Sequence, residues 1–305
     1  MRLGLLTAAF PKMSLEEVAD WMHSERFGAI EVACWPVGEG PARRYAGVSH
    51  IDVARLDRAR AADIRAMLDD RGLVISSLGY YPNALHPDPE HRKAAATHLK
   101  RVIEGAALLD VGVVGTFVGR DPARSIDDSF KDFKKVWPGL VAHAEAHGVK
   151  IAIENCPMLF SRDEWPGGNN LAYSPANWRR MFDLIDSPSF GLNFDPSHLV
   201  WQMIDIERAI DEFAEKIFHA HAKDLEIDRD GLYANGVMSA GVGWQRPRLP
   251  GLGEVRWDRF FAALYRNGYD HVVSIEHEDR QFERTTDLVK RGFLIARDVL
   301  SPYIQ

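Results

Sequence analysis

Four residues with acidic or imidazole side chains lie at or near the ends of short apolar segments in the second half of the chain. They are Glu154 in KIAIEN, Asp195 in FGLNFD, His221 in IFHAHAKD and Glu276 in HVVSIEH. Three carboxylates and one imidazole form an oxygen-rich set of the kind that binds one divalent metal ion. The set therefore indicates metal-assisted chemistry on a small polyol or keto-sugar.

Short apolar runs alternate with longer amphipathic stretches along the whole chain. The expected strands are 2–7, 29–34, 73–78, 113–118, 150–155, 190–195, 217–222 and 271–276. The expected helices are 14–25, 57–71, 89–109, 126–147, 175–186, 204–214, 256–267 and 284–300. Eight strand–helix units in succession predict a single (β/α)8 TIM barrel in the α/β class, with residues 1–305 forming one domain.

The helix boundaries carry their own signals. Four residues are expected to cap helix N-termini: Ser14 (with Glu17 three residues on), Asp88, Ser125 and Ser174. Four glycines are expected to close helices before the next strand: Gly72, Gly112, Gly148 and Gly268.

The alternation within the strands places the four residues on one face. Counting back by two, Ala152 shares a face with Glu154, and Asn193 shares one with Asp195. The bulky residues lie on the opposite face, which is expected to pack on the outer helices, while the small and polar face lines the barrel interior. Glu31, between the outward-facing Ile30 and Val32, is likewise expected to face the barrel interior. Because active sites of such barrels lie at the C-terminal strand ends, the four residues are expected to meet there.

Composition narrows the possible classes. The 305 residues are 46% hydrophobic and 27% charged, as in ordinary globular proteins, and the net charge of -7 disfavours a nucleic-acid partner. Two cysteines make no disulfide framework, and no apolar run approaches the roughly 18 residues of a membrane span. The N-terminal apolar run is too short for a secretory signal. We therefore expect a cytoplasmic enzyme that binds neither nucleic acid nor a membrane.

The motifs resemble those of the xylose isomerase-like sugar isomerase/epimerase superfamily, which includes the tagatose and psicose 3-epimerases. The matching segments are IAIEN, NFDPSH, HAHAKD, SIEHED and the loop LPGLGEVRW at 249–257. The resemblance implies that Glu154, Asp195, His221 and Glu276 bind one Mn²⁺, Mg²⁺ or Co²⁺ ion, with Mn²⁺ favoured. It also implies that Glu154 and Glu276 are the acid/base pair and that His198 contacts substrate.

A DNA-repair branch of the superfamily, the endonuclease IV type, uses three zinc ions and needs further histidines. This chain has VVGTFVGR at the fourth strand and KDLEIDRDGLY after His221, with no histidine in either segment. The sequence keeps the one-metal set, so DNA is not the expected substrate.

Several further residues are candidates for contacts with substrate. Lys223 could neutralise a developing oxyanion, or could form a rim salt bridge with Asp224. Glu31 could bind a sugar hydroxyl, or could pair with a buried cation. His219, one layer below His221, is interpreted as part of a supporting network rather than as a ligand.

The loops at the active-site end add more candidates. Trp35, His86 and Arg246 are expected near the mouth of the barrel, Arg246 as a clamp for an anionic group. Other aromatic candidates on these loops are Tyr80, Trp165 and Trp244. The segment 225–254 is unusually long for a loop after the seventh strand, and is a candidate lid or partner-facing surface.

Several functions remain open on this sequence. The first is an isomerase or epimerase that abstracts a proton next to a carbonyl through a metal-stabilised enediolate. The second is a lyase that cleaves 3-keto-glycosides, including C-glycosides, with a possible small partner subunit. An inositol-ketone dehydratase and a non-catalytic sugar-binding barrel are further alternatives. The family resemblance also implies a homo-oligomer.

Overall fold

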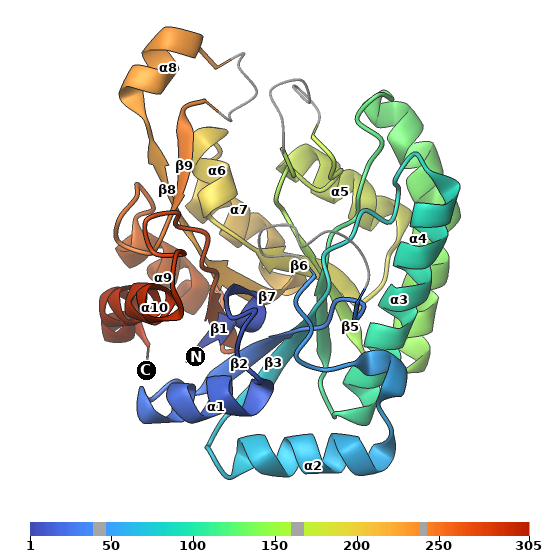
Figure 1. The fold of residues 1–305 in the computed structure, drawn as a ribbon. Coiled ribbons are helices and arrows are strands. Elements are labelled where there is room, and N and C mark those ends of the chain that lie inside the picture. Colours follow the sequence, from blue (N-terminus) through green and yellow to red (C-terminus); the bar gives the residue numbers. More distant parts are fainter. Residues whose placement is uncertain (39–46, 160–167, 238–242, 305) are drawn as a thin grey trace.

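A computed structural model of the chain describes residues 1–38, 47–159, 168–237 and 243–304. Eight parallel strands close into a barrel in the order β1-β10-β7-β6-β5-β4-β3-β2, with helices around the outside (Figure 1). The barrel strands are β1 (Arg2–Leu6), β2 (Ala29–Ala33), β3 (Val74–Gly79), β4 (Val113–Thr116), β5 (Lys150–Glu154), β6 (Phe190–Phe194), β7 (Ile217–Ala222) and β10 (Val272–Ile275). The (β/α)8 barrel expected from the sequence is confirmed.

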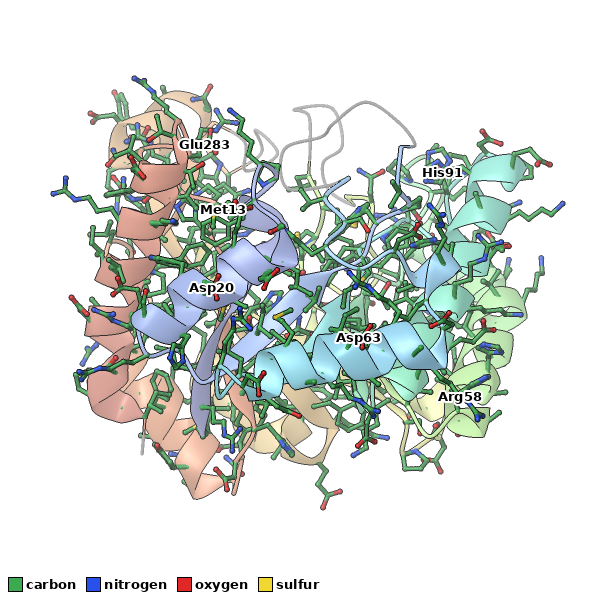
Figure 2. The ribbon with its side chains drawn as sticks, turned by 60° about the horizontal axis from the view of Figure 1, so that its bottom comes forward. Met13, Asp20, Arg58, Asp63, His91 and Glu283 are labelled. Atoms are coloured by element: carbon green, nitrogen blue, oxygen red, sulfur yellow. The ribbon has the colours of Figure 1, made fainter. Side chains whose placement is uncertain are left out.

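The eight expected helices are also present, and every strand and helix boundary falls within two residues of the expected one. These helices are α1 (Leu15–Ser24), α2 (Arg58–Asp69), α3 (Pro89–Leu108), α4 (Ile126–Ala146), α5 (Pro175–Leu184), α7 (Ile206–Phe213), α9 (Trp257–Arg266) and α10 (Thr286–Leu300). Short 3-10 helices lie at Thr7–Ala9, Val53–Arg55, Ala214–Lys216 and Ser301–Tyr303. Charged residues such as Asp20 on α1 and Asp63 on α2 lie on the outer surface (Figure 2).

The long segment 225–254 contains secondary structure that the sequence analysis did not predict. Strands β8 (Asp224–Ile227) and β9 (Gln245–Arg248) pair antiparallel, and helix α8 (Arg229–Asn235) follows β8. Figure 1 shows this arm projecting from the C-terminal end of the barrel. A further short helix, α6 (Ser197–Trp201), directly follows β6. Both additions lie at the end of the barrel where the site was expected.

Packing confirms the predicted phase of the strands. Phe190 on β6 contacts Phe133 and Trp137 of α4, with ring centroids 6.1 and 5.7 Å apart. Phe194 on the same strand contacts Trp178 of α5. The bulky residues thus face the helices, and the residues between them face the barrel interior.

The predicted caps hold at three of four positions. Ser14 forms a capping box with Glu17, and Asp88 and Ser125 each accept a backbone N–H of the first turn. Ser174 occupies the predicted N-cap position, but its side chain makes no cap hydrogen bond, and Pro175 begins the helix without an N–H to satisfy. The prediction that Gly112 closes a helix is wrong. Asp110, two residues earlier, takes the left-handed conformation after α3.

In the part of the chain that the structure describes, no helix combines the length and apolar character needed to cross a membrane.

We expect Ser14→Ala to lower the free energy of unfolding by about 1 kcal/mol, because it removes the hydrogen bond to the Glu17 N–H. Urea denaturation followed by circular dichroism measures the change. Ser174→Ala is the matched control and should change the unfolding free energy little. An equal loss in both variants would contradict the assignment of the cap.

Candidate metal centre and active site

Four strand ends bring the predicted ligands together. Glu154 ends β5, Asp195 follows β6, His221 lies in β7 and Glu276 follows β10. Each offers a ligand atom, and these atoms all lie within 4.8 Å of one another. His221 Nδ1 lies 3.4 Å from Glu276 Oε2 and 3.9 Å from Glu154 Oε2. Atoms bound at about 2.1 Å to a common ion stand roughly 3 to 4 Å apart, so the spacing suits one metal.

Buried polar atoms that make no regular hydrogen bond support the same conclusion. Among the described residues, Glu154 Oε1, Asp195 Oδ2 and His221 Nδ1 are buried without a hydrogen bond, and charged side chains lie within 4 Å of them as ion-pair neighbours. Buried polar atoms in folded proteins are nearly always hydrogen-bonded, and a bound cation explains an exception. The donor set, three carboxylates and one imidazole, fits a divalent metal with a preference for oxygen ligands.

Glu31 orients the imidazole of His221. Its Oε2 lies 2.9 Å from His221 Nε2, and its Oε1 accepts a hydrogen bond of 2.6 Å from the Tyr81 hydroxyl. When Nε2 donates to Glu31, Nδ1 keeps its lone pair for a metal, a common arrangement at metal sites. The structure thus engages both Glu31 oxygens within the protein; its role as a contact to a sugar hydroxyl remains a prediction.

The Glu31 carboxylate is held in its charged form. Burial alone raises its pKa, but the imidazoles of His221 and His219 and the Tyr81 hydroxyl outweigh burial and lower the pKa to about 2. The hydrogen bond between Tyr81 and Glu31 depends on Gly115 of β4, because a Cβ at that position would collide with the Tyr81 hydroxyl.

Lys223 lies among the carboxylates. Its Nζ is 2.5 Å from Glu276 Oε2, 3.0 Å from Asp195 Oδ2 and 3.3 Å from Glu278 Oε2. Burial alone lowers the pKa of Lys223, but these carboxylates raise it well above its ordinary value. The ammonium therefore stays charged and partly offsets the repulsion among the acids.

The alternative salt bridge between Lys223 and Asp224 is not formed. Asp224 is buried, and its carboxylate accepts hydrogen bonds from the backbone N–H groups of Leu225, Gly251 and Val255 and from the Trp257 indole. It anchors the segment after β9 to the end of β7.

The two proposed bases have opposite pKa shifts. Burial, and then the negative charge of Glu276, raise the pKa of Glu154. Burial also acts to raise the pKa of Glu276, but Lys223 and His221 outweigh it and lower that pKa. Carboxylates whose environments separate their pKa values are suited to divide acid and base roles.

His198 lies on α6 and points back to the site; its contact with substrate remains a prediction. Its Nε2 lies 3.2 Å from Asp195 Oδ2 and 3.4 Å from Glu154 Oε1. His219 lies one layer deeper, where its two ring nitrogens contact Asn193 Oδ1 at 3.0 Å and Ser76 Oγ at 3.1 Å. His219 is therefore part of the supporting network, as interpreted from its position.

The rim candidates differ in where the structure places them. Trp35 is buried beside Tyr81, with ring centroids 5.9 Å apart, and thus lies next to the Glu31 network. His86 stacks on His91 at 4.1 Å, and Arg246 pairs with Asp228 and Glu226 in the arm. Among the described contacts, neither His86 nor Arg246 touches the four ligands.

The remaining aromatic candidates lie in different parts of the structure. Tyr80 packs edge-on against Trp35, and Trp244 is buried in the arm beside Trp201. Trp165 lies outside the described residues.

Sequence reasoning missed several residues of the site. Tyr81 and Asn193 bridge the barrel, with the Asn193 side chain donating to the Tyr81 hydroxyl at 3.1 Å. Asn155 donates to the Asp195 carbonyl and accepts from the Asp195 N–H, which ties β5 to β6. Glu278 is the fourth carboxylate around Lys223. Asn193 shares the inward phase of Asp195, and this signal could have found it; nothing local marks Tyr81.

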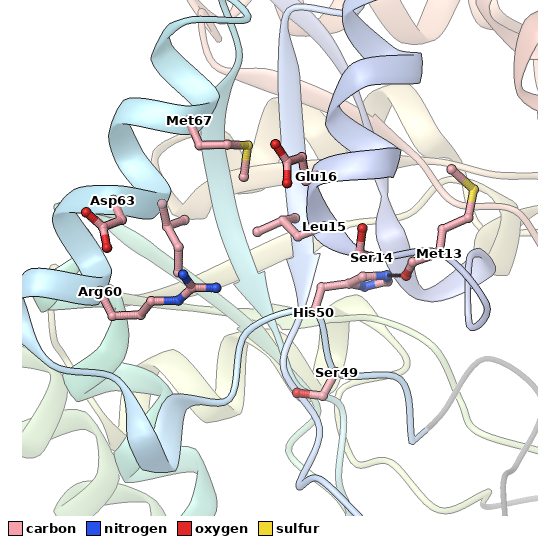
Figure 3. Close-up of a pocket in the computed structure, with 10 residues that line it drawn as sticks. Met13, Ser14, Leu15, Glu16, Ser49, His50, Arg60, Asp63 and Met67 are labelled. Carbon is pink, nitrogen blue, oxygen red and sulfur yellow. Dashed lines mark hydrogen bonds between the residues drawn. The ribbon is translucent and has the colours of Figure 1, made fainter.

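A separate cavity of about 510 Å³ lies outside this site, between the start of α1 and the side of α2 (Figure 3). His50 borders it and is fixed by a contact of 3.1 Å between its Nε2 and the Met13 carbonyl. None of the four metal-ligand candidates lines this cavity.

The fold and site define the class of protein. A family model for the xylose isomerase-like TIM barrel matches residues 20–298, and the chain belongs to this family. The uncharacterized protein YfiH of Bacillus subtilis is 36% identical over 153 residues, which are 47% of this chain and 45% of that protein. An inosose dehydratase of Clostridium perfringens is 27% identical over 106 residues, 32% of this chain and 34% of that protein. The matches thus span less than half the length of these curated relatives.

Solved structures share the fold across the chain. D-psicose 3-epimerase with D-tagatose from Clostridium cellulolyticum H10 has a TM-score of 0.73, with 16% identity and full coverage of both chains. The IOLI protein with a bound zinc atom has a TM-score of 0.72, with 18% identity and full coverage of both chains. The solved structures that share this fold thus include a sugar epimerase and a metal-binding protein.

We expect Glu31→Gln to weaken binding of Mn²⁺ by about 10- to 100-fold, because the amide no longer holds the His221 imidazole as a charged acceptor. Isothermal titration calorimetry on chelator-treated protein measures the affinity. Asp228→Asn, in the arm, is the control and should leave the affinity unchanged. Native affinity in Glu31→Gln would contradict the orienting role.

Burial of His219 makes stability depend on pH. Burial lowers its pKa from 6.5 to about 4. Below pH 6.5 the unfolded chain therefore binds a proton that the folded protein does not, and the stabilisation present above pH 6.5 is lost as pH falls towards 4, by about 3 kcal/mol at most. We expect His219→Gln to flatten this dependence in metal-free protein, measured as urea midpoints at several pH values. Parallel curves for the native protein and the variant would refute it.

Proposed function

We propose that the protein is a divalent-metal-dependent isomerase or epimerase of a keto-sugar or related polyol. The observation that carries the proposal is the placement of Glu154 and Glu276 on strands three steps apart around the barrel, within one shared metal-ligand set. A binding protein has no need of two such bases. The carboxylate-rich set favours Mn²⁺, with Mg²⁺ and Co²⁺ as alternatives.

Glu154, Asp195, His221 and Glu276 would hold the metal, which supplies Lewis-acid polarisation of a carbonyl and a neighbouring hydroxyl oxygen. One of the carboxylates Glu154 and Glu276 removes the proton from the carbon next to the carbonyl. The other returns a proton to the opposite face, which inverts the centre. Return to the neighbouring carbon gives aldose–ketose isomerisation instead.

Other residues of the chain position the substrate in this proposal. The Lys223 ammonium faces the oxygen on which negative charge develops, where a buried cation is effective. His198, aimed at Glu154 and Asp195 from α6, binds a substrate hydroxyl. Trp35 offers an apolar wall, and His86 and Arg246 bind more distant parts of a substrate.

A dehydratase or related lyase is the second candidate. The similarity to an inosose dehydratase over 106 residues favours it. The same bases would remove the proton next to the carbonyl, and a group on the adjacent carbon would then leave. Product analysis separates the two candidates: a new sugar indicates isomerisation or epimerisation, and a released group indicates a lyase.

We also propose a cytoplasmic location, because both Cys34 and Cys156 are free thiols. The proposed partners are a small sugar substrate and further copies of the chain, with a small partner subunit as an alternative, and neither nucleic acid nor a membrane.

The test is exchange of a substrate C–H with solvent in D₂O, followed by NMR with Mn²⁺-loaded protein and a panel of ketoses, 3-keto-glucose, 3-keto-glycosides and inositol ketones. We expect metal-dependent loss of one C–H signal. Glu154→Gln and Glu276→Gln should each reduce exchange by about 100-fold or more, because each removes a base.

Asp63→Asn, on the outer surface of α2, serves as the control with native exchange. Native exchange rates in both glutamine variants would refute the base pair. Absence of exchange across the whole panel, with metal shown to be bound, would count against the proposed reaction.

A further inference from the structure

A second group of metal-ligand side chains lies beside the first. Glu154, Cys156 and His198 each offer a ligand atom, and these atoms lie within 4.8 Å of one another. The group shares only Glu154 with the first set. It differs in chemistry, because it contains a thiol and has one carboxylate rather than three.

The two oxygens of Glu154 face different neighbours. Oε2 lies 3.9 Å from His221 Nδ1, on the side of the first set. Oε1 lies 3.4 Å from His198 Nε2, on the side of the second group. A carboxylate with one oxygen towards each group can bridge two metal ions.

Three buried polar atoms also border the second group. Glu154 Oε1, Asp195 Oδ2 and His198 Nε2 make no hydrogen bond of regular geometry among the described residues, and His198 Nε2 lies within ion-pair distance of both carboxylate oxygens. Asp195 Oδ2 lies 3.2 Å from His198 Nε2 and can supply a fourth ligand. The four atoms would comprise one sulfur, one nitrogen and two carboxylate oxygens.

The backbone around Cys156 is held in place. Asn170 donates hydrogen bonds to the carbonyls of both Glu154 and Cys156, at 3.0 and 2.7 Å. The N–H of Met158 donates to Cys156 Sγ at 3.3 Å, and Met158 has a positive φ of 56°. These contacts hold the Cys156 sulfur in place beside Glu154 and His198.

We propose that Glu154, Cys156 and His198, with Asp195 as the fourth ligand, form a second metal site for a thiophilic divalent ion such as Zn²⁺. Thiolate and imidazole ligands in a tetrahedral set suit zinc, whereas Mn²⁺ and Mg²⁺ prefer oxygen ligands. The two sites therefore differ in metal preference and share Glu154 and Asp195.

The charges of the neighbourhood allow a second cation. Lys223 Nζ lies 3.8 Å from Glu154 Oε1 and 3.0 Å from Asp195 Oδ2, so a metal at the second site competes with it for these oxygens. Glu278, at 3.3 Å from the ammonium, belongs to neither ligand group and keeps it paired. The second metal would also engage His198 and Glu154, so the one-metal and two-metal forms present different surfaces to a substrate.

The test is a Co²⁺ titration of chelator-treated native protein followed by absorption in the near ultraviolet, where thiolate-to-cobalt charge transfer absorbs. We expect the first equivalent, bound by carboxylates and His221, to give little of this absorption. The second equivalent should give a strong band. Cys156→Ser should lose the band and still bind the first equivalent.

Two controls isolate the signal. Cys34 is fully buried directly after β2, and Cys34→Ala should keep the band. A partly exposed group also has metal-ligand spacing: Glu104 on α3, His143 on α4 and His147 directly after α4. It contains no thiol and gives no charge-transfer band. Cobalt bound there does not mimic the expected result.

A second readout uses native protein, so that the proposal can still be tested if the Cys156→Ser variant does not fold. In native protein, a second equivalent of Zn²⁺ should protect one thiol from a maleimide reagent, whereas excess Mn²⁺ should not. A band that appears with the first equivalent of Co²⁺, a band that persists in Cys156→Ser, or no protection by Zn²⁺ would overturn the proposal. These readouts need no substrate, so they stand or fall independently of the proposed reaction.

Discussion

Burial of like charges in one small space is the constraint on which this site depends. Glu31, Glu154 and Asp195 are buried at the C-terminal end of the barrel or just beneath it, and the partly buried Glu276 and Glu278 stand beside them. Carboxylates removed from water repel one another strongly and need compensating cations. Lys223 supplies one such charge and the imidazole of His221 pairs with Glu31, but the carboxylates around Lys223 still outnumber it, and Glu154 Oε1 and Asp195 Oδ2 make no hydrogen bond in the described structure. A divalent ion resolves this imbalance.

The barrel supplies the rigidity that such a concentration of charge requires. Each ligand is at or next to the end of a strand whose outward residues are locked against helices, as Phe190 is against Trp137. Inside, Glu31 on β2 reaches His221 on β7, and Tyr81 reaches Asn193 on β6. Hydrogen bonds thus cross the barrel below the metal-ligand atoms and fix their orientation.

The sequence predicted the repeating parts of this structure well. Strand alternation and eight strand–helix units were sufficient for the fold and for the convergence of Glu154, Asp195, His221 and Glu276. It predicted less where contacts join segments far apart in the chain. Tyr81 is 112 residues from Asn193, and no local pattern indicates that pair. Arg246 was expected at the mouth, but β8 and β9 carry it into ion pairs with Asp228 and Glu226 that loop length alone could not reveal.

The central claim is that the four strand-end residues bind one divalent metal. Anomalous X-ray diffraction from crystals grown with Mn²⁺ tests it most directly. The account predicts a single strong peak bonded to Glu154, Asp195, His221 and Glu276, with Lys223 paired to Glu278. Mn²⁺ absent from this position, with the Lys223 ammonium still among the carboxylates, would contradict the account.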